Sequence, residues 1–168
     1  KVTLESDENV RLMLRIPAWA RNFKVNGKAP EVIVKGYAVV EAGHRAVVTV
    51  EMDKPLMKLM AHPYVDADHG RVAFMRGPVL YCCEKKVENW EELDFTLASD
   101  KPVMNSDGTV TVKSKDGEEF TLIEYRTWNN NGPLPMRIWF RQDGYVTDTM
   151  NTDGWEALLY RPFAEYDM

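Results

Sequence analysis

The chain has 168 residues, 45% of them hydrophobic and 11% aromatic, which is enough to bury the core of one large or two small β domains. Its 26 acidic and 21 basic residues are interspersed and leave a net charge of −5, which argues against a nucleic-acid partner because such a partner needs a clustered basic surface. No apolar run approaches the roughly 18 residues of a membrane span, and the first residues carry neither a starter Met nor a signal peptide. We therefore expect a segment of a longer protein, without a membrane partner.

The first third of the chain is predicted to form short strands. Over residues 10–16, apolar side chains alternate with Arg11, Met13 and Arg15, as in a strand with one buried face. Asn26-Gly27 is a strong hairpin signal because both residues tolerate positive φ. The pattern continues at close spacing as a β meander, through residues 31–34, 37–41 and 45–52. Residues 55–61 are apolar in a pattern that fits either a strand or a short helix.

Residues 70–84 are predicted to be the centre of the fold. Both faces of their two halves are largely apolar, which is typical of strands buried on both sides. Gly77-Pro78 divides the run, because proline donates no ladder hydrogen bond and glycine permits a bend. We expect two strands joined at a bend, one of them passing between sheets, with Phe74 and Tyr81 deeply buried.

Charged residues surround Trp90 after this stretch, which indicates an exposed helical turn or a linker. We place a domain boundary near Val87, so that residues 1–87 form a first β-sandwich domain and residues 88–168 a second. Further strands are predicted at residues 95–98, 109–113, 119–126 and 135–141. We expect Pro162 to end a last apolar piece that starts at Trp155, and the polar residues 143–153 to form a mobile loop.

The predicted fold class is all-β. Roughly a dozen short strands with turn signals between them, and no amphipathic helix longer than about two turns, favour an antiparallel β-sandwich. We expect a jelly-roll-like arrangement in two consecutive small sandwich domains.

No catalytic constellation follows from the residues. Cys82 and Cys83 are adjacent, which disfavours a disulfide between them, and we interpret them as small buried side chains. The histidines are scattered and match no metal-ligand spacing: His44, His62 and His69. Asp66, Asp68 and Glu84 are interpreted as surface carboxylates rather than as the facing acid pair of a glycosidase. We therefore predict no catalytic residue and no metal site in this chain.

One segment has the composition of a carbohydrate site. Tyr125 and Trp128 offer aromatic faces for sugar C–H groups, while Arg126 and Asn130 offer hydrogen bonds to hydroxyls, all at the end of a predicted strand. The alternative is that the two rings fill the edge of the core and the asparagines satisfy a turn.

Three groups of residues together form a recognisable pattern. The first comprises residues 14–19 (Leu-Arg-Ile-Pro-Ala-Trp), 25–28 and 36–37, and the second residues 70–73, 76–82 and Glu84. The third comprises Tyr125, Trp128, Asn130, Gly132-Pro133, Met136 and Trp139. In order and spacing, over about residues 1–142, they resemble the C-terminal β-sandwich region of glycoside hydrolase family 127, the β-L-arabinofuranosidase family. The chain departs from the family at Asn131, where arginine is usual.

The resemblance implies that a large N-terminal (α/α)6 barrel precedes this region and holds the active site. In the family, a cysteine nucleophile, a glutamate acid/base and a zinc ion held by cysteines and a glutamate all lie on that barrel. Zinc is thus implied only for the catalytic domain, and no cofactor is implied for this chain. The barrel also contains an adjacent cysteine pair, but Cys82-Cys83 has the flanks of a strand, so that role is not carried over.

What the resemblance implies for function is a non-catalytic part of a bacterial glycoside hydrolase that acts on plant-type glycans. Its expected partners are the barrel of the same polypeptide and a second copy in a homodimer, in a cytoplasmic or periplasmic setting that is left open. Two alternatives are an autonomous carbohydrate-binding module and a structural or dimerisation domain without sugar affinity. An apolar face for the barrel is expected, with certain methionines either on it or in the core: Met13, Met52, Met57 and Met60.

Overall fold

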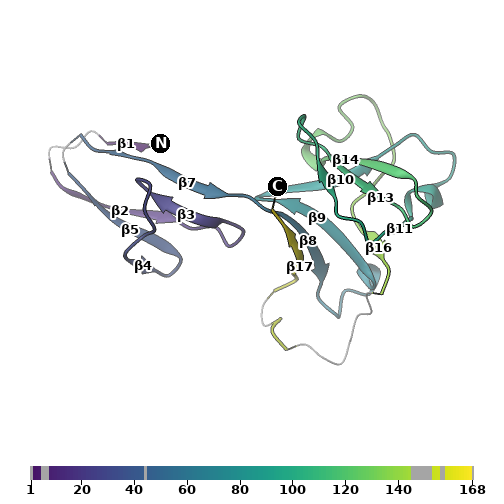
Figure 1. Ribbon diagram of the computed structural model, residues 1–168, viewed down its shortest axis with the longest axis horizontal. Coiled ribbons are helices and arrows are strands. Elements are labelled where there is room, and N and C mark those ends of the chain that lie inside the picture. The colour runs from purple at the N-terminus through teal and green to yellow at the C-terminus, as the bar shows by residue number, and fades with distance from the viewer. Residues whose placement is uncertain (1, 5–7, 44, 145–152, 156–157, 168) are drawn as a thin grey trace. The chain divides into compact units, whose positions relative to one another are not determined.

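A computed structural model of the chain describes residues 2–4, 8–43, 45–144, 153–155 and 158–167 (Figure 1). The described residues form short, mostly antiparallel strands and three 3-10 helices, which confirms the all-β prediction. The pairing is consistent with a β-sandwich, whereas the jelly-roll order and the division into two sandwiches stay predictions. The chain separates into two compact units, Lys1–Pro55 and Leu56–Met168. Within the described ranges, no helix combines the length and the apolar character that a bilayer crossing requires.

The first unit contains three small sheets. Their strand orders are β2-β5-β4, β3-β7 and β1-β6. The strands are β1 (Val2–Thr3), β2 (Val10–Arg15), β3 (Arg21–Val25), β4 (Ile33–Val34), β5 (Tyr37–Ala42), β6 (Val47–Val48) and β7 (Val50–Asp53).

Strand β2 confirms the predicted half-buried strand, but its partner is not the segment that follows it in sequence. It pairs antiparallel with β5, with Leu12 opposite Val40 and Leu14 opposite Ala38. This register places the apolar alternation of both strands on one face, where Leu12 and Leu14 pack against a buried cluster that includes Ala38. The core of this unit is completed by Val25, Ala42 and Val48.

The predicted turn at Asn26-Gly27 is present. Both residues have positive φ, 49° and 76°, and Val25 and Lys28 form a single bridge across them. The Oδ1 of Asn26 also accepts a hydrogen bond of 2.9 Å from the backbone amide of Thr49. The same region contains the ladder between β3 and β7, with Val25 opposite Val50.

The second unit contains a ten-stranded sheet. The main path has the order β11-β16-β9-β10-β14-β13-β12, while β8 pairs with β9 and β17, and β15 pairs with β10. The strands are β8 (Leu56–Ala61), β9 (Arg71–Arg76), β10 (Val79–Glu84), β11 (Thr96–Leu97), β12 (Val103–Met104), β13 (Val110–Lys113), β14 (Glu119–Glu124), β15 (Met136–Arg137), β16 (Phe140–Gln142) and β17 (Tyr160–Tyr166). The 3-10 helices are η1 (Asp66–Asp68), η2 (Trp90–Leu93) and η3 (Tyr125–Thr127).

The central stretch is a hairpin of β9 and β10. Arg76 pairs with Val79, so Gly77-Pro78 is a two-residue turn, with Gly77 at a φ of 57°. Strand β10 pairs with β9 only at its start, and from Tyr81 onward it pairs with β14. The expected passage between two sheets is not found, because β9, β10 and β14 all belong to one ten-stranded sheet, in which β10 changes its neighbour after Leu80.

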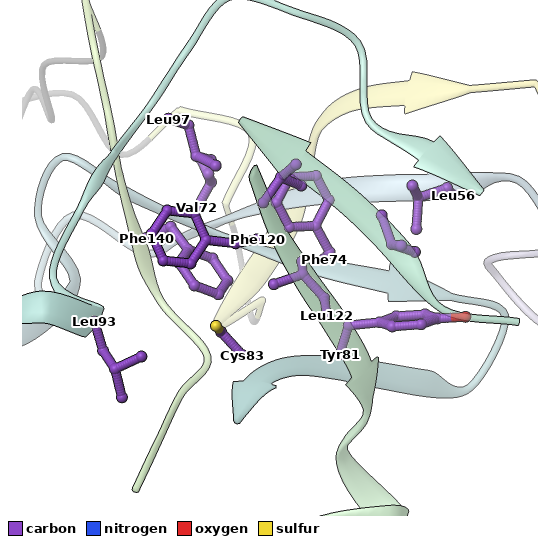
Figure 2. Close-up of a cluster of buried hydrophobic side chains, with 12 residues drawn as sticks. Leu56, Val72, Phe74, Tyr81, Cys83, Leu93, Leu97, Phe120, Leu122 and Phe140 are labelled. Carbon is purple, nitrogen blue, oxygen red and sulfur yellow. The ribbon is translucent and has the colours of Figure 1, made fainter. Parts of the chain in front are cut away.

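The main core confirms the predicted burial of Phe74 and Tyr81, which are each 1% exposed. Figure 2 shows these side chains gathered with Phe120, Phe140 and Leu122 between strands of the second unit. Tyr81 satisfies its hydroxyl by donating to the carbonyl of Gly108 at 3.1 Å. A buried tyrosine of this kind can remain in the core because its one polar atom is hydrogen-bonded.

The position expected for a domain boundary, Val87, lies inside the second unit. Strand β10 before it and β14 after it belong to the same sheet, with Cys82 opposite Ile123. The charged segment between them contains η2, closed by a capping box of Asn89 and Glu92, with Trp90 60% exposed. The segment forms the predicted exposed helical turn. It connects two strands of the same sheet and is not a linker between domains. Local composition does not distinguish the two.

The prediction that Pro162 ends the last element is wrong. Strand β17 runs through Pro162 and pairs with β8, with a register shift between Pro162 and Ala164. Proline is tolerated there because β17 pairs on one side only among the described strands and the register is irregular at that point. Of the loop predicted over residues 143–153, residues 145–152 lie outside the described residues.

Candidate functional site

The segment predicted to contact carbohydrate is an ordered turn after β14. Helix η3 contains Tyr125 and Arg126, and the indole Nε1 of Trp128 donates to the carbonyl of Leu134 at 2.9 Å. Asn129 has a φ of 67°, and its backbone amide donates to the carboxylate of Glu84 at 3.0 Å. The asparagine therefore serves a left-handed turn, as the alternative interpretation expected for these residues.

Two of the four predicted residues contact each other directly. The rings of Tyr125 and Trp128 are stacked, 5.9 Å apart at 21°. Tyr125 is 39% exposed and Trp128 is half-buried. In the stack, one face of each ring is directed toward the other ring. Arg126 and Asn130 are both exposed on the same turn, and the Nε of Arg126 lies 2.5 Å from Oε2 of Glu124. Each ring therefore has at most one face left for a sugar, beside these polar groups.

Cys82 and Cys83 are buried in β10 and carry free thiols. Burial raises the pKa of each thiol to about 11. Thiols of this kind stay protonated near neutral pH, and a protonated thiol is neither a nucleophile nor a metal ligand. Across the part of the chain that is described, no three His, Cys, Asp or Glu side chains are grouped to hold a metal.

The sheet β2-β5-β4 has a partly apolar outward face, whose location the sequence did not reveal. Met13 lies opposite Val39, whose amide donates to the carbonyl of Val32, and Val34 lies opposite Tyr37. Met13, Val32 and Val34 are 52%, 49% and 40% exposed. A groove of about 620 Å³ adjoins this face, bordered by Val32, Val39 and Glu41 among others. We call Met13, Val32, Val34, Val39 and Tyr37 the outward face.

The methionines expected on such a face or in the core divide between the two. Met13 is exposed, and Met57 is buried in β8. Met52 and Met60 are half-buried. Of these four, only Met13 contributes to the outward face.

A feature that the sequence did not reveal is an ion-pair cluster around Asp94, the C-cap residue that follows η2. Arg71 donates to both carboxylate oxygens, Arg137 Nη1 lies 2.9 Å from Oδ1, and Arg141 Nη2 lies 2.6 Å from Oδ2. The hydrogen bonds from Arg71, and then those from Arg141, hold the pKa of Asp94 well below its ordinary value although burial opposes the shift. One carboxylate thus neutralises only one of three guanidiniums.

Sequence spacing hides this cluster, because Arg71 and Arg141 lie 23 and 47 positions from Asp94. They meet because β9 and β16 are neighbours and Arg71 stands opposite Arg141. The available signal in the sequence was Arg71, which begins a largely apolar strand. An arginine whose side chain is largely buried needs a partner of opposite charge.

Comparison with known proteins identifies the family. Residues 56–141, just over half of the chain, match the glycoside hydrolase family 127 C-terminal domain. The chain belongs to glycoside hydrolase family 127. The match begins at the first residue of the second compact unit, Leu56. The predicted resemblance is confirmed.

The similar proteins are much longer than this chain. It is 41% identical over 100 residues to the non-reducing end β-L-arabinofuranosidase of Bifidobacterium longum, a stretch that covers 55% of this chain and 15% of that protein. The crystal structure of a family 127 β-L-arabinofuranosidase from Geobacillus stearothermophilus T6 matches with a TM-score of 0.62 and 25% identity, over 84% of this chain and 28% of that one. A solved family 127 β-arabinofuranosidase matches in fold, with a TM-score of 0.61, 24% identity and coverage of 83% and 28%. The chain therefore corresponds to a small part of these relatives.

Proposed function

We propose that this chain is a supporting, non-catalytic β-sandwich part of a larger glycoside hydrolase that removes L-arabinofuranose units from plant-type glycans. The observation that carries the proposal is the match to a C-terminal domain family whose relatives are several times longer than the chain. The partner is the N-terminal catalytic barrel that the family resemblance implies, in the same polypeptide.

The outward face supports a packing role. Removing exposed valine and methionine side chains from water lowers the free energy, so another surface that covers them is bound favourably. Met13 and Val34 lie on neighbouring rows of this sheet and are bordered by charged residues such as Arg11 and Glu41. An apolar centre with a polar rim is the usual anatomy of an interface.

Hydrogen exchange tests this role. We compare the chain alone with the polypeptide extended by the residues encoded upstream of Lys1. The amides of β4 and β5 are expected to exchange more slowly in the extended polypeptide, and Val34→Lys should abolish that difference. Val47→Lys is the matched control, because Val47 is 47% exposed on β6, outside the outward face. Equal exchange in the two polypeptides would refute packing on this face.

Light scattering across a concentration series separates the supporting role from its rivals. A chain that associates through the outward face is expected to become monomeric in Met13→Lys. Self-association that survives this change favours a dimerisation domain with another interface. A strictly monomeric, highly soluble wild-type chain favours an autonomous module.

The supporting role also implies that the chain alone hydrolyses no glycoside and binds no stoichiometric zinc. The measurement is turnover of aryl α- and β-L-arabinofuranosides, with elemental analysis after purification without a metal-affinity tag. Turnover that disappears in Cys82→Ala or Cys83→Ala, or one zinc per chain, would overturn the proposal.

A carbohydrate-binding role is the second candidate, and the stacked pair Tyr125 and Trp128 is the observation that favours it. Tyr125, with Arg126 and Asn130 beside it, would contact the sugar. Affinity electrophoresis in gels containing arabinan tests it, with Tyr125→Ala as the variant and Tyr64→Ala as the control. Tyr64 is a suitable control because it is a tyrosine of the same unit that is 73% exposed and lies outside this turn. Identical migration of Tyr125→Ala and wild type would remove this role.

A further inference from the structure

Strand β4 forms an open edge of the sheet β2-β5-β4 (Figure 1). It pairs with β5 on one side and with no second strand among those described. The amide of Val39 donates to the carbonyl of Val32 at 2.9 Å, and the next residue, Ile33, lies opposite Ala38. Hydrogen-bonded and non-hydrogen-bonded pairs alternate in an antiparallel ladder, so the N–H and C=O of Ile33 point away from β5. This edge is therefore a template for another strand.

The edge is apolar and lacks the usual protection against pairing. Val32, Ile33 and Val34 are 49%, 58% and 40% exposed. Edge strands are commonly blunted by a proline, a bulge or a charge within the strand. Strand β17, which pairs only with β8 among the described strands, carries Pro162 and a register shift. Residues 32–34 contain neither proline nor charge. Covering them with a second strand would remove apolar surface from water.

The charges at the two ends of this edge identify the partner. The segment reads Glu-Val-Ile-Val-Lys over residues 31–35, with an acid two positions before Ile33 and a base two positions after it. When a second copy pairs antiparallel, with Ile33 opposite Ile33, Glu31 of each copy faces Lys35 of the other. Both are exposed. Lys35 begins the turn into β5, with a φ of 49°, and its long side chain has the reach for this pair. A shifted register would separate the charges, so the segment is complementary to itself in one register.

We propose that two copies of this chain associate by antiparallel pairing of their β4 strands, about a two-fold axis between the two Ile33 residues. A contact of this kind is closed, so it makes a dimer and not a fibre. The axis is perpendicular to the sheet, so the outward faces of both copies lie on the same side and stay open to the catalytic barrel. The proposal thus goes beyond the supporting role and does not depend on it. Association that survives Met13→Lys is expected at this edge.

A charge exchange tests the pairing by analytical ultracentrifugation of the chain. The wild-type chain is expected to dimerise reversibly as its concentration rises to about 1 mM, a range that detects a millimolar dissociation constant. Glu31→Lys and Lys35→Glu should each weaken the dimer about tenfold or more, because two attractive pairs become repulsive. Lys101→Glu, the same change at an exposed residue of the second unit, should leave the dimer unchanged.

An equimolar mixture of the Glu31→Lys and Lys35→Glu chains should dimerise again. In the mixed dimer, each lysine at one end of the edge faces a glutamate of the other copy, so both attractive pairs return. A wild-type chain that stays monomeric at about 1 mM would overturn the proposal. So would single variants that associate as tightly as wild type, or a mixture that associates no better than its two components.

The backbone of Ile33 gives a second test. Ile33→Pro removes an N–H that makes no ladder bond to β5, so the variant is expected to fold and to stay monomeric. Ile33→Val keeps the N–H and should still dimerise. Should Ile33→Pro fail to fold, hydrogen exchange of the wild-type chain decides: the Ile33 amide should exchange more slowly as concentration rises, and that of Val103, on the edge strand β12, should not. Exchange at Ile33 that is independent of concentration would refute the pairing.

Discussion

Glu84, the last residue of β10, accepts a hydrogen bond at 3.0 Å from the backbone amide of Asn129. The contact joins the end of the central hairpin to the turn after β14, where Asn129 has a φ of 67°. A left-handed residue costs free energy, and the carboxylate offsets part of that cost.

The first prediction concerns this contact. Glu84→Ala should lower the free energy of unfolding by about 1 to 2 kcal/mol and speed hydrogen exchange at the Asn129 amide, because a hydrogen bond to a charged acceptor is lost. Glu84→Gln retains an acceptor oxygen and should change both quantities less. Unaltered exchange at Asn129 in Glu84→Ala would show that the contact does not hold the turn.

The second prediction concerns the core. Phe74→Ala should cost about 3 to 5 kcal/mol, because the change removes buried surface and leaves a cavity beside Phe140, whose ring centroid lies 6.3 Å away. Urea unfolding measures the cost. Met13→Ala is the control, since Met13 is 52% exposed and should lose little. A Phe74→Ala midpoint and slope equal to those of wild type would contradict the central place given to this hairpin.

The third prediction concerns Cys82 and Cys83. With each pKa raised by burial to about 11, only about one thiol in a thousand is ionised at pH 8, so iodoacetamide should modify neither cysteine until the protein unfolds. Mass spectrometry after timed quenching reads this out. Rapid labelling of the folded chain would mean that the end of β10 opens readily.

The same two thiols make stability depend on alkaline pH. A pKa that is higher in the folded state than its ordinary value of 9.0 adds stability that is complete below pH 9 and is lost as pH rises toward about 11. The Cys82→Ser and Cys83→Ser variants should therefore show a weaker loss of stability across that window.

The fourth prediction concerns Asp94. Asp94→Asn should lower stability at pH 7 by about 3 kcal/mol, since three arginines lose their counter-charge. Because the pKa of Asp94 is depressed in the folded state, its contribution is present above about pH 4 and lost as pH falls further. The difference between wild type and variant should thus shrink in acid. Asp100→Asn, at an exposed carboxylate, should show no such difference at any pH.

Local sequence pattern predicted the strands better than their partners. Residues 10–16 and 70–84 were identified because alternation and turn residues are short-range signals, and a short-range signal also located the turn at Asn26-Gly27. The pairing of β2 with β5, and the separation of two compact units after Pro55, depend on contacts between distant segments. The polar network at Asp94 was missed for the same reason. Of the carbohydrate segment, the sequence predicted a polar turn but not the stacking that occupies one face of each ring.

The pairing of strand β17 affects how the second unit folds. It pairs with β8, the first strand of that unit, although the two lie about one hundred residues apart in the sequence. During synthesis on the ribosome, β8 emerges long before β17. One edge of β8 therefore stays unpaired while the strands between them are translated. High contact order of this kind slows folding and leaves an unpaired edge that another chain can extend. Shortening the chain before Tyr160 would make that exposure permanent, and insoluble aggregates rather than a slightly weaker fold should be the outcome.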